Sequence, residues 1–319
     1  MSGAETIGVD LGGTKVLVGV VGEGREILYQ DREVSAGQGQ DELLATLERE
    51  VRQAMDAQPD VAGIGLGIPC TIDRERGVAI SAVNLPIRDL PIRDWMHDRL
   101  GLPVFIDNDA NVAALAELRF GAAQGARDAV MLTVGTGIGG GVIVNGEVYR
   151  GSTGAASEPG HMVIDVNGPP CQGNCPSNGC LETFTSGTAL AREGRAMAEQ
   201  NPDSALGKAL AENGEIDGKA VTDAARAGDA AALEVVEEAG RLLGVGLSGL
   251  ANIFEPAVFV IGGGVGKILG ELIVGPAREE LRRRALPPMN EVPVKLAELG
   301  PDAGMIGAAE MARLELEGS

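Results

Sequence analysis

Apolar side chains recur at two different spacings along the chain, and the alternation between them predicts an α/β fold. Residues 39–57 repeat apolar positions every three or four residues, as one face of an amphipathic helix does. Residues 6–21 instead form two apolar runs separated by a glycine pair, which predicts a hairpin of buried strands. Further predicted elements are a strand entering a Gly/Pro loop (61–73), a helix (95–100), a strand continuing as a helix (103–120), a hairpin (130–144) followed by an Asn145-Gly146 turn signal, helices (183–250), a strand, glycine turn and helix (257–285), a strand (292–299) and a final helix (303–316).

Length and repetition together predict two lobes. A chain of 319 residues exceeds what one hydrophobic core usually supports. Residues 7–21 and 130–144 share a similar layout, in which a glycine-rich turn separates two apolar runs. We therefore expect two related lobes, each of which opens with a glycine-rich hairpin.

The net charge of −20 argues against nucleic acid as a partner, because phosphate groups are bound mainly by Lys and Arg. No apolar run is long enough to cross a bilayer, so no membrane partner is expected. The N-terminal stretch MSGAETIGVDLGG has neither the positive segment nor the apolar segment of a secretory signal. We expect a soluble, cytoplasmic protein whose cysteines are reduced.

Residues 158–182 concentrate side chains that bind metals. The four candidate ligands are His161, Cys171, Cys175 and Cys180. This combination suits a tetrahedral zinc ion, and unlinked structural thiols are the alternative. Disulfides would suit a secreted chain, but three cysteines cannot all pair. Cys70 lies in an apolar context, GIGLGIPCTID, and is interpreted as a small buried hydrophobic residue.

Three glycine-rich turns allow bare backbone to approach an anionic ligand. The first, residues 12–15, follows Asp10 at the end of a predicted strand. The second, residues 135–140, satisfies G-x-G-x-x-G, but a strand follows it, whereas a dinucleotide-binding turn must open a helix. The third, residues 262–264, joins a strand to a helix whose first amides offer donors. Together with a carboxylate between the lobes, these turns indicate phosphoryl transfer from a nucleotide.

Asp109 stands where a predicted strand becomes a helix, and two interpretations compete for it. Asp109 or Asn111 can simply cap the helix, which is a common role for these residue types at such a position. Alternatively, a carboxylate at the C-terminal end of a strand can face a ligand and act as a base. The residue types alone favour capping, and the other motifs of the chain must decide between a cap and a base.

Six ordered segments resemble the ROK family of sugar kinases and sugar-responsive repressors, within the actin-like ATPase and sugar-kinase superfamily. The segments are GVDLGGTK (8–15), NDANVAALAE (108–117), GTGIGGGVIVNG (135–146), EPGH (158–161), CPSNGCLE (175–182) and IGGGV (261–265). Within the family, they are most similar to bacterial ATP-dependent glucokinases. The resemblance implies an α/β fold of the two-lobed actin-like ATPase (ribonuclease H-like) type with an interlobe cleft. The small N-terminal lobe would contain residues 1–118, joined by the C-terminal helix 303–319, and the large lobe, residues 119–302, would carry the zinc loop and the nucleotide site.

The resemblance also implies a reaction, the phosphorylation of D-glucose at its 6-hydroxyl by ATP and Mg²⁺. Asp109 would be the catalytic base that takes the proton of that hydroxyl. The residues implied to bind the sugar are Asn84, Asn108, Asp109, Glu158, His161 and Glu182, with the loop 67–71 beside them. The residues implied to bind the nucleotide and Mg²⁺ are Asp10, Gly12, Gly13, Thr14, Lys15, Gly135, Thr136, Gly137, Gly262, Gly263 and Gly264. We also expect a structural zinc ion, and the resemblance implies a homodimer or homotetramer.

Residues 158–182 depart from the family pattern in three ways. Cys171 and Cys175 enclose three residues where the family has one, Pro176 replaces a glycine, and Pro159 replaces a residue that is more often Ile or Leu. We keep Cys171 as a zinc ligand, because the extra residues can bulge outward without moving the sulfur.

Three alternatives accompany the glucose kinase. A ROK kinase for another hexose, such as N-acetylmannosamine, N-acetylglucosamine or fructose, would differ only modestly in its pocket. A sugar-responsive repressor would carry a helix-turn-helix region before the first hairpin, which here begins at residue 6. Polyphosphate as the phosphate donor is disfavoured by the acidity of the chain.

Overall fold

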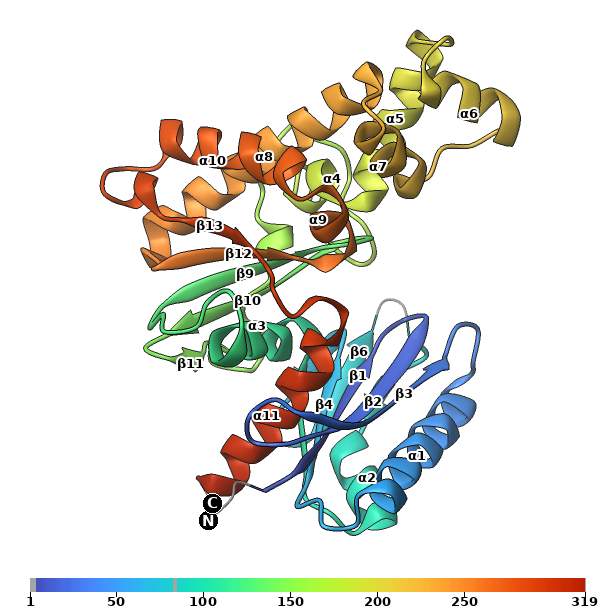
Figure 1. Ribbon diagram of the computed structural model, residues 1–319, viewed down its shortest axis with the longest axis vertical. Helices are drawn as coiled ribbons and strands as arrows, with labels where there is room; N and C mark the ends of the chain where they lie inside the picture. The colour runs from blue at the N-terminus through green and yellow to red at the C-terminus, as the bar shows by residue number, and fades with distance from the viewer. Residues whose placement is uncertain (1–3, 83–84, 319) are drawn as a thin grey trace. The chain divides into compact units, whose positions relative to one another are not determined.

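The structure, a computed structural model, describes residues 4–82 and 85–318. The chain packs into two compact units (Figure 1). The first is drawn from Met1–Gly125, Gly141–Ser157 and Pro301–Ser319, and the second from Ala126–Gly140 and Glu158–Gly300. Within the described ranges, no helix is both long enough and apolar enough to cross a membrane.

The first unit is built on a five-stranded sheet. Its strands are β1 (Thr6–Leu11), β2 (Lys15–Val21), β3 (Ile27–Val34), β4 (Ile64–Ile68) and β8 (Val104–Asn108). They lie in the order β3-β2-β1-β4-β8, and β1 and β2 form the predicted antiparallel hairpin. β4 runs parallel to both β1 and β8, so the carboxyl ends of these three strands meet at one edge of the sheet.

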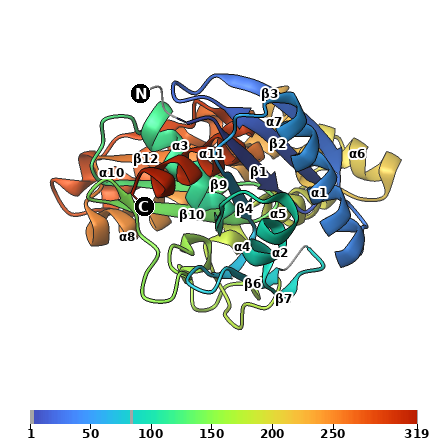
Figure 2. The same ribbon diagram turned by 90° about the horizontal axis from the view of Figure 1, so that it is seen from below.

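Helices cover both faces of this sheet (Figures 1 and 2). The other elements of the unit are α1 (Gln40–Ala57), β5 (Cys70–Asp73), β6 (Val78–Ala82), β7 (Arg88–Leu90), α2 (Ile92–Leu100), α3 (Asp109–Phe120), β11 (Glu147–Val148) and α11 (Ala303–Glu317). On one face, apolar side chains of β1 such as Ile7 belong to the same buried core as Leu47 of α1. On the other face lies α11, side by side with α3.

Two glycines allow α11 to lie directly on the sheet. A Cβ atom at Gly65 would lie 1.8 Å from the carbonyl oxygen of Ala308, and one at Gly8 would lie 1.9 Å from that of Met305. Thr6 Oγ1 also donates a 2.8 Å hydrogen bond to the carbonyl oxygen of Ala309. The C-terminal helix is therefore part of the core of the first unit.

The second sheet has the strand order β11-β10-β9-β12-β13. Its further strands are β9 (Ala129–Val134), β10 (Ile138–Val144), β12 (Val258–Gly262) and β13 (Val294–Leu296). β12 is parallel to both β9 and β13. β10 begins in the second unit and continues past Gly140 into the first, where it forms a hairpin with β11. At its turn Asn145 and Gly146 both have positive φ, 56° and 83°, as the Asn-Gly hairpin signal predicts.

Helices make up most of the rest of the second unit. They are α4 (Glu182–Thr185), α5 (Gly187–Gln200), α6 (Ala205–Asn213), α7 (Gly218–Arg226), α8 (Ala230–Phe254), α9 (Gly263–Leu269) and α10 (Glu271–Arg284). Short 3₁₀ helices are η1 (Pro159–His161) and η2 (Met289–Glu291), and η3 (Gly300–Asp302) lies where the chain passes back into the first unit. α8 and α10 pack closely, since a Cβ atom at Gly244 would lie 2.5 Å from the carbonyl oxygen of Ala277. Residues 162–181 run without a regular helix or strand and carry the cysteine cluster.

The two sheets repeat one arrangement. In the first, the hairpin of β2 and β1 is followed by the parallel strands β4 and β8. In the second, β10 and β9 are neighbours, and the parallel strands β12 and β13 follow them in the same order. The similarity of the two glycine-rich hairpins in the sequence therefore extends to the sheets that they open.

Three local predictions differ from the structure. Residues 67–71, predicted as a loop, contain the end of β4 and the start of β5, which pairs with β6. The single helix predicted after the third glycine turn is two helices, because Gly270, with φ 52° and ψ −123°, ends α9 and turns the chain into α10. α2 begins at Ile92, earlier than the predicted start at residue 95.

Candidate active site

Two carboxylates lie at the carboxyl edge of the first sheet. Asp10 is near the end of β1, and Asp109 is the first residue of α3, directly after β8. Burial and the charge of Asp109 raise the pKa of Asp10 from 3.8 to about 6, against the lowering effect of Lys15. Burial also raises the pKa of Asp109, although Asp109 Oδ1 accepts a 2.9 Å hydrogen bond from Ala110 N. This pair of carboxylates suits a cation, which would remove the cost of holding both ionised.

The first glycine turn, residues 12–15, lies between β1 and β2. Gly12 N donates a 2.9 Å hydrogen bond to the carbonyl oxygen of Lys15, which closes the turn. Ser35, just after β3, holds it from the side, because Ser35 Oγ donates to the carbonyl oxygen of Gly12 at 3.2 Å and Ser35 N donates to that of Thr14 at 3.0 Å. The conformation of the turn is thus fixed by the chain itself.

Asn108 is the residue that caps α3. Its Oδ1 accepts hydrogen bonds from Ala110 N at 2.9 Å and from Asn111 N at 3.4 Å. The capping role that the sequence assigns to Asp109 or Asn111 therefore belongs to Asn108. A cap at this position leaves Asp109 in the first turn of the helix, at the carboxyl edge of the sheet.

Asp107 fixes this strand-to-helix junction from inside the unit. Its side chain is 3% exposed, and its Oδ1 accepts hydrogen bonds from Asn108 N at 2.8 Å and Asn111 Nδ2 at 3.0 Å. Its Oδ2 accepts a 2.6 Å hydrogen bond from Arg150 Nε, and Arg74 Nε lies 4.0 Å away. Oδ1 therefore fixes the junction internally, and Oδ2 links the junction to Arg150, which follows β11.

The second glycine turn, residues 135–137, is held by the start of α5. Gly135 N donates to the carbonyl oxygen of Gly137 at 2.9 Å, and Gly187 N donates to that of Gly135 at 2.7 Å. Thr188 donates to the carbonyl oxygen of Thr136 twice, from its N at 3.3 Å and from its Oγ1 at 2.9 Å. The turn is thus anchored through its carbonyl groups.

Glu182 lies against the same turn. Its Oε2 accepts a 2.7 Å hydrogen bond from Ile138 N, and its carboxylate is largely buried. A Cβ atom at Gly137 would lie 2.3 Å from Glu182 Oε2, so only glycine at that position lets the Glu182 carboxylate lie against the turn. The third glycine turn has a similar requirement at Gly263, where φ is 80° and a Cβ atom would lie 2.4 Å from the carbonyl oxygen of Val134.

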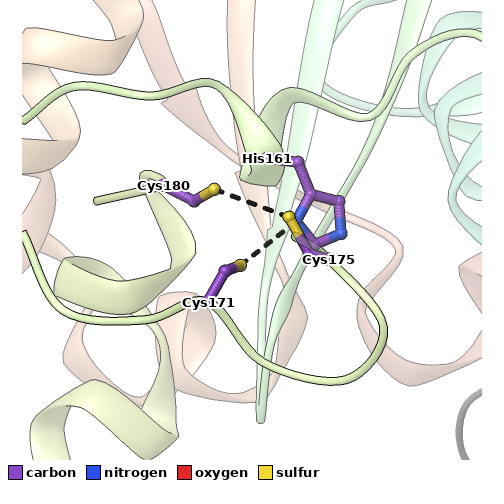
Figure 3. Close-up of side chains that lie close together, drawn as sticks. All are labelled: His161, Cys171, Cys175 and Cys180. Carbon is purple, nitrogen blue, oxygen red and sulfur yellow. Dashed lines mark hydrogen bonds between the residues drawn. The ribbon is translucent and has the colours of Figure 1, made fainter. Parts of the chain in front are cut away.

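His161, Cys171, Cys175 and Cys180 converge in the second unit, in the segment that we call the metal loop, residues 161–180 (Figure 3). Their ligand atoms all lie within 4.8 Å of one another. Cys171 Sγ is 3.4 Å from His161 Nδ1, and Cys175 Sγ is 3.8 Å from Cys180 Sγ. All three thiols are free, and backbone hydrogen bonds such as Cys171 N to the carbonyl oxygen of Ser177, 2.9 Å, hold the loop.

These separations fit one tetrahedral ion. Zinc–sulfur bonds of about 2.3 Å and zinc–nitrogen bonds of about 2.0 Å place two sulfurs about 3.8 Å apart and a sulfur and a nitrogen about 3.5 Å apart. The Cys175–Cys180 and Cys171–His161 pairs have these separations. The His/Cys₃ cluster is therefore compatible with a structural zinc ion.

The extra residues between Cys171 and Cys175 point outward. Gly173, with φ 60°, and Asn174 are exposed, while the sulfur of Cys171 stays in the cluster. Cys70 lies elsewhere, buried in β5, and burial raises the pKa of its thiol to about 12. It therefore stays a neutral, apolar side chain, as its sequence context predicts.

The remaining residues predicted to bind substrate divide between the two units. Asn108 and Asp109 belong to the first unit, and Glu158, His161 and Glu182 to the second. Asn84 lies outside the described residues. Sequence reasoning missed Asp107, Arg150 and Thr188. A charged residue inside the apolar strand PVFID could have indicated Asp107, but no local signal marked the other two.

The arrangement of sheets, glycine turns and metal loop is that of a known class of sugar-kinase fold. A family model described as the ROK family matches residues 6–315, so the chain belongs to the ROK family. The resemblance of the six segments is thereby confirmed, together with the α/β fold that it implies.

Three relatives are similar over nearly the whole chain. A glucokinase of Halalkalibacterium halodurans is 37% identical over 314 residues, which cover 96% of this chain and 94% of that protein. A glucokinase of Thermotoga maritima is 36% identical over 315 residues, 98% of each. The crystal structure of a ROK family glucokinase from Streptomyces griseus in complex with glucose and AMPPNP matches with a TM-score of 0.85 and 37% identity, covering 98% of this chain and 100% of that one.

Proposed function

We propose that this chain is an ATP-dependent glucokinase, which transfers the γ-phosphoryl group of ATP to the 6-hydroxyl of D-glucose. The observation that carries the proposal is the likeness, over nearly the whole chain, to glucokinases, one of them solved with glucose and AMPPNP. The predicted reaction class, a hexokinase-type phosphotransferase, agrees with these relatives. None of these three relatives favours another hexose, a repressor function or polyphosphate as the donor.

In the first unit, Asp109 would be the catalytic base. Its raised pKa supports this role, because a general base works best when its pKa approaches the working pH. In a loose phosphoryl-transfer transition state, such a base mainly orients the attacking hydroxyl. Asn108, whose Oδ1 caps α3, would present its Nδ2 to the sugar. The backbone of residues 12–15 would face the phosphates.

Mg²⁺ would be held with the help of Asp10. The support is the pKa of about 6, which marks a buried carboxylate that a cation would stabilise in its ionised form. When bound, Mg²⁺ would neutralise charge on the phosphate oxygens of ATP. Lys15, at the start of β2, would add a further positive charge on the same side of the hairpin.

In the second unit, the sugar hydroxyls would form hydrogen bonds with Glu158, His161 and Glu182. Because Glu182 Oε2 accepts from Ile138 N, its Oε1 would be the oxygen offered to the sugar. His161 Nδ1 faces the cysteine cluster, so its Nε2 would be the nitrogen for a hydroxyl (Figure 3). The backbone of residues 135–137 and 262–264 would bind the nucleotide.

The metal loop would hold one structural zinc ion through His161, Cys171, Cys175 and Cys180. The free thiols and the separations of 3.4 Å and 3.8 Å support this assignment. Zinc would supply no chemistry to the transfer and would keep His161 and Glu182 in place. We also retain as proposals the lobe boundaries at residues 118 and 302 and a homodimer or homotetramer.

A coupled assay of ADP release tests the reaction. Glucose should have the highest kcat/KM in a panel with fructose, N-acetylglucosamine and N-acetylmannosamine, and 6-deoxyglucose should give no turnover. Asp109→Ala should remove nearly all turnover and leave part of the glucose binding, whereas the exposed carboxylate Asp56, replaced by Asn, should leave both unchanged. ATP consumption with none of the hexoses, or full activity in Asp109→Ala, would contradict the proposal.

A further inference from the structure

The start of α5 lies between the metal loop and the second glycine turn. On the side of the turn, Gly187 N and Thr188 Oγ1 donate to the carbonyl oxygens of Gly135 and Thr136, at 2.7 Å and 2.9 Å. A shift of the first residues of α5 would therefore move the backbone of the turn with it.

On the side of the metal loop, Gln172 reaches the same helix start. Gln172 Nε2 donates a 3.3 Å hydrogen bond to Ser186 Oγ, which is the N-cap of α5 and accepts from Ala189 N at 3.2 Å. Ser186 is fully buried. Gln172 is one of the three residues between Cys171 and Cys175, so this segment makes a contact beyond the metal cluster.

A second route leads from the last metal ligand to the turn. Cys180, which is fully buried, is followed after one residue by Glu182, whose Oε2 accepts from Ile138 N at 2.7 Å. Leu181, between them, donates from its N to the carbonyl oxygen of Met162 at 2.8 Å. The backbone from Cys180 to Glu182 is thus fixed at both ends, by the cluster and by the turn.

We propose that Gln172, Glu182 and Thr188 are positioning residues that transmit the conformation of the metal loop to the Gly135–Gly137 turn, so that zinc binding and nucleotide binding are coupled. The inference rests on the proposed function in one respect, which is that this turn holds the phosphates of the nucleotide. An ion that orders the loop removes part of the entropy cost of ordering the turn. Coupling of this kind is reciprocal, so nucleotide must strengthen zinc binding by the same factor.

Calorimetric titration with Mg·ADP tests the coupling directly. Zinc-loaded protein should bind ADP roughly tenfold more tightly than protein stripped of zinc, within the range of ordinary coupling. In the reverse experiment, saturating ADP should raise the affinity for zinc, measured by competition with a chromogenic chelator, by the same factor. Equal ADP affinity with and without zinc would overturn the proposal.

If the protein unfolds when zinc is removed, single-residue variants that keep their zinc still test the coupling. Gln172→Ala should retain its zinc and bind ADP roughly threefold to tenfold more weakly, as the loss of one hydrogen bond predicts. In this variant ADP should also raise the affinity for zinc by a smaller factor than in the parent protein. Asn174→Ala, an exposed change in the same segment, is the matched control and should behave as the parent. Thr188→Val, which removes the hydroxyl but keeps the shape, should weaken ADP binding similarly, and Thr188→Ser should restore it.

The outcomes separate the two proposals. If zinc-loaded protein binds no ADP, both the proposed function and the coupling fail. If it binds ADP and phosphorylates glucose, but Gln172→Ala and Thr188→Val retain parental ADP affinity with full zinc, the coupling alone fails.

Discussion

Asp107 Oδ2 accepts a 2.6 Å hydrogen bond from Arg150 Nε, and the Asp107 side chain is only 3% exposed. Removing the guanidinium would leave a buried charge whose nearest remaining cation, Arg74 Nε, lies 4.0 Å away. Breaking a buried pair on one side costs about 3–5 kcal/mol. Because Arg74 compensates in part, we expect Arg150→Gln to lower the free energy of unfolding by roughly 2–4 kcal/mol in urea titrations.

An exposed ion pair provides the control for this prediction. Arg195 and Glu199 are 53% and 58% exposed and pair on the surface of α5. Arg195→Gln should cost less than about 1 kcal/mol, because water screens such pairs. A loss at Arg150 as small as the loss at Arg195 would mean that the Asp107 carboxylate does not depend on its partner.

The raised pKa of Asp10 has a defined effect on stability. Its folded-state pKa of about 6 lies above the ordinary value of 3.8, so ionisation of Asp10 opposes folding. The penalty is absent below pH 3.8, develops between pH 3.8 and 6, and is complete above that window. Asp10→Asn should therefore raise the free energy of unfolding at pH 7.5 by roughly 2–3 kcal/mol without Mg²⁺ and nucleotide, and the gain should vanish near pH 4.

Thermal melts across this pH range measure the effect. Asp60→Asn, which changes an exposed carboxylate, should leave the melting temperature unchanged at every pH. A melting temperature that does not rise in Asp10→Asn at pH 7.5 contradicts the prediction.

The same carboxylate predicts an acid limb in the pH dependence of activity. If Asp10 must be ionised to help hold Mg²⁺, kcat/KM for glucose should fall as pH drops through about 6. Raising the Mg²⁺ concentration should move the limb to lower pH, because the cation competes with the proton. A profile that stays flat to pH 5 at limiting Mg²⁺ would exclude Asp10 from this role.

Metal content should distinguish the cysteines. We expect about one zinc ion per chain in the parent protein. Cys171→Ala should reduce bound zinc and the melting temperature, while Cys70→Ala should keep the full zinc content, since Cys70 lies in β5, outside the cluster. Elemental analysis after dialysis measures this, and full zinc in Cys171→Ala would remove Cys171 from the ligand set.

The close approach of α11 to the first sheet predicts opposite effects at two glycines. Gly65→Ala places a Cβ atom 1.8 Å from the carbonyl oxygen of Ala308, and overpacking of this kind costs about 1–3 kcal/mol or more. Gly249→Ala, in the interior of α8, meets only an ordinary contact with Met162 Sδ, at 3.5 Å, and should stabilise the protein by roughly 0.5–1 kcal/mol. Urea titrations of both variants measure the difference, and tolerance of Gly65→Ala would contradict the packing.

Local signals carried the accurate predictions. The hairpin at residues 6–21, the junction at Asn108 and Asp109, and the Asn145-Gly146 turn depend on neighbouring residues and are present in the structure. The metal cluster was predictable because its four ligands lie within one short segment. Hydrophobic periodicity and turn chemistry act over a few positions, which is why they could be read without the fold.

The features that were missed depend on distant residues. Asp107 and Arg150 are separated by 43 positions, and no pattern in either neighbourhood indicates that they pair. β5 forms because β6 offers its backbone groups, although a Gly/Pro context precedes it. Gly270 ends α9 through its backbone conformation, and the apolar pattern continues through it without interruption. At these positions, contacts with residues distant in the sequence determine the conformation, and local preferences do not.

The contact between Thr6 and Ala309 joins residues 303 positions apart and gives the protein an order of assembly on the ribosome. β1 precedes nearly all of the second unit along the chain, but the helix that covers its glycine-lined face follows that unit. The nascent chain must therefore shelter an incomplete first core while all of the second unit is being translated. Loss of residues 303–317 would leave the first sheet in that unfinished state, so α11 is an unsuitable place for a truncation.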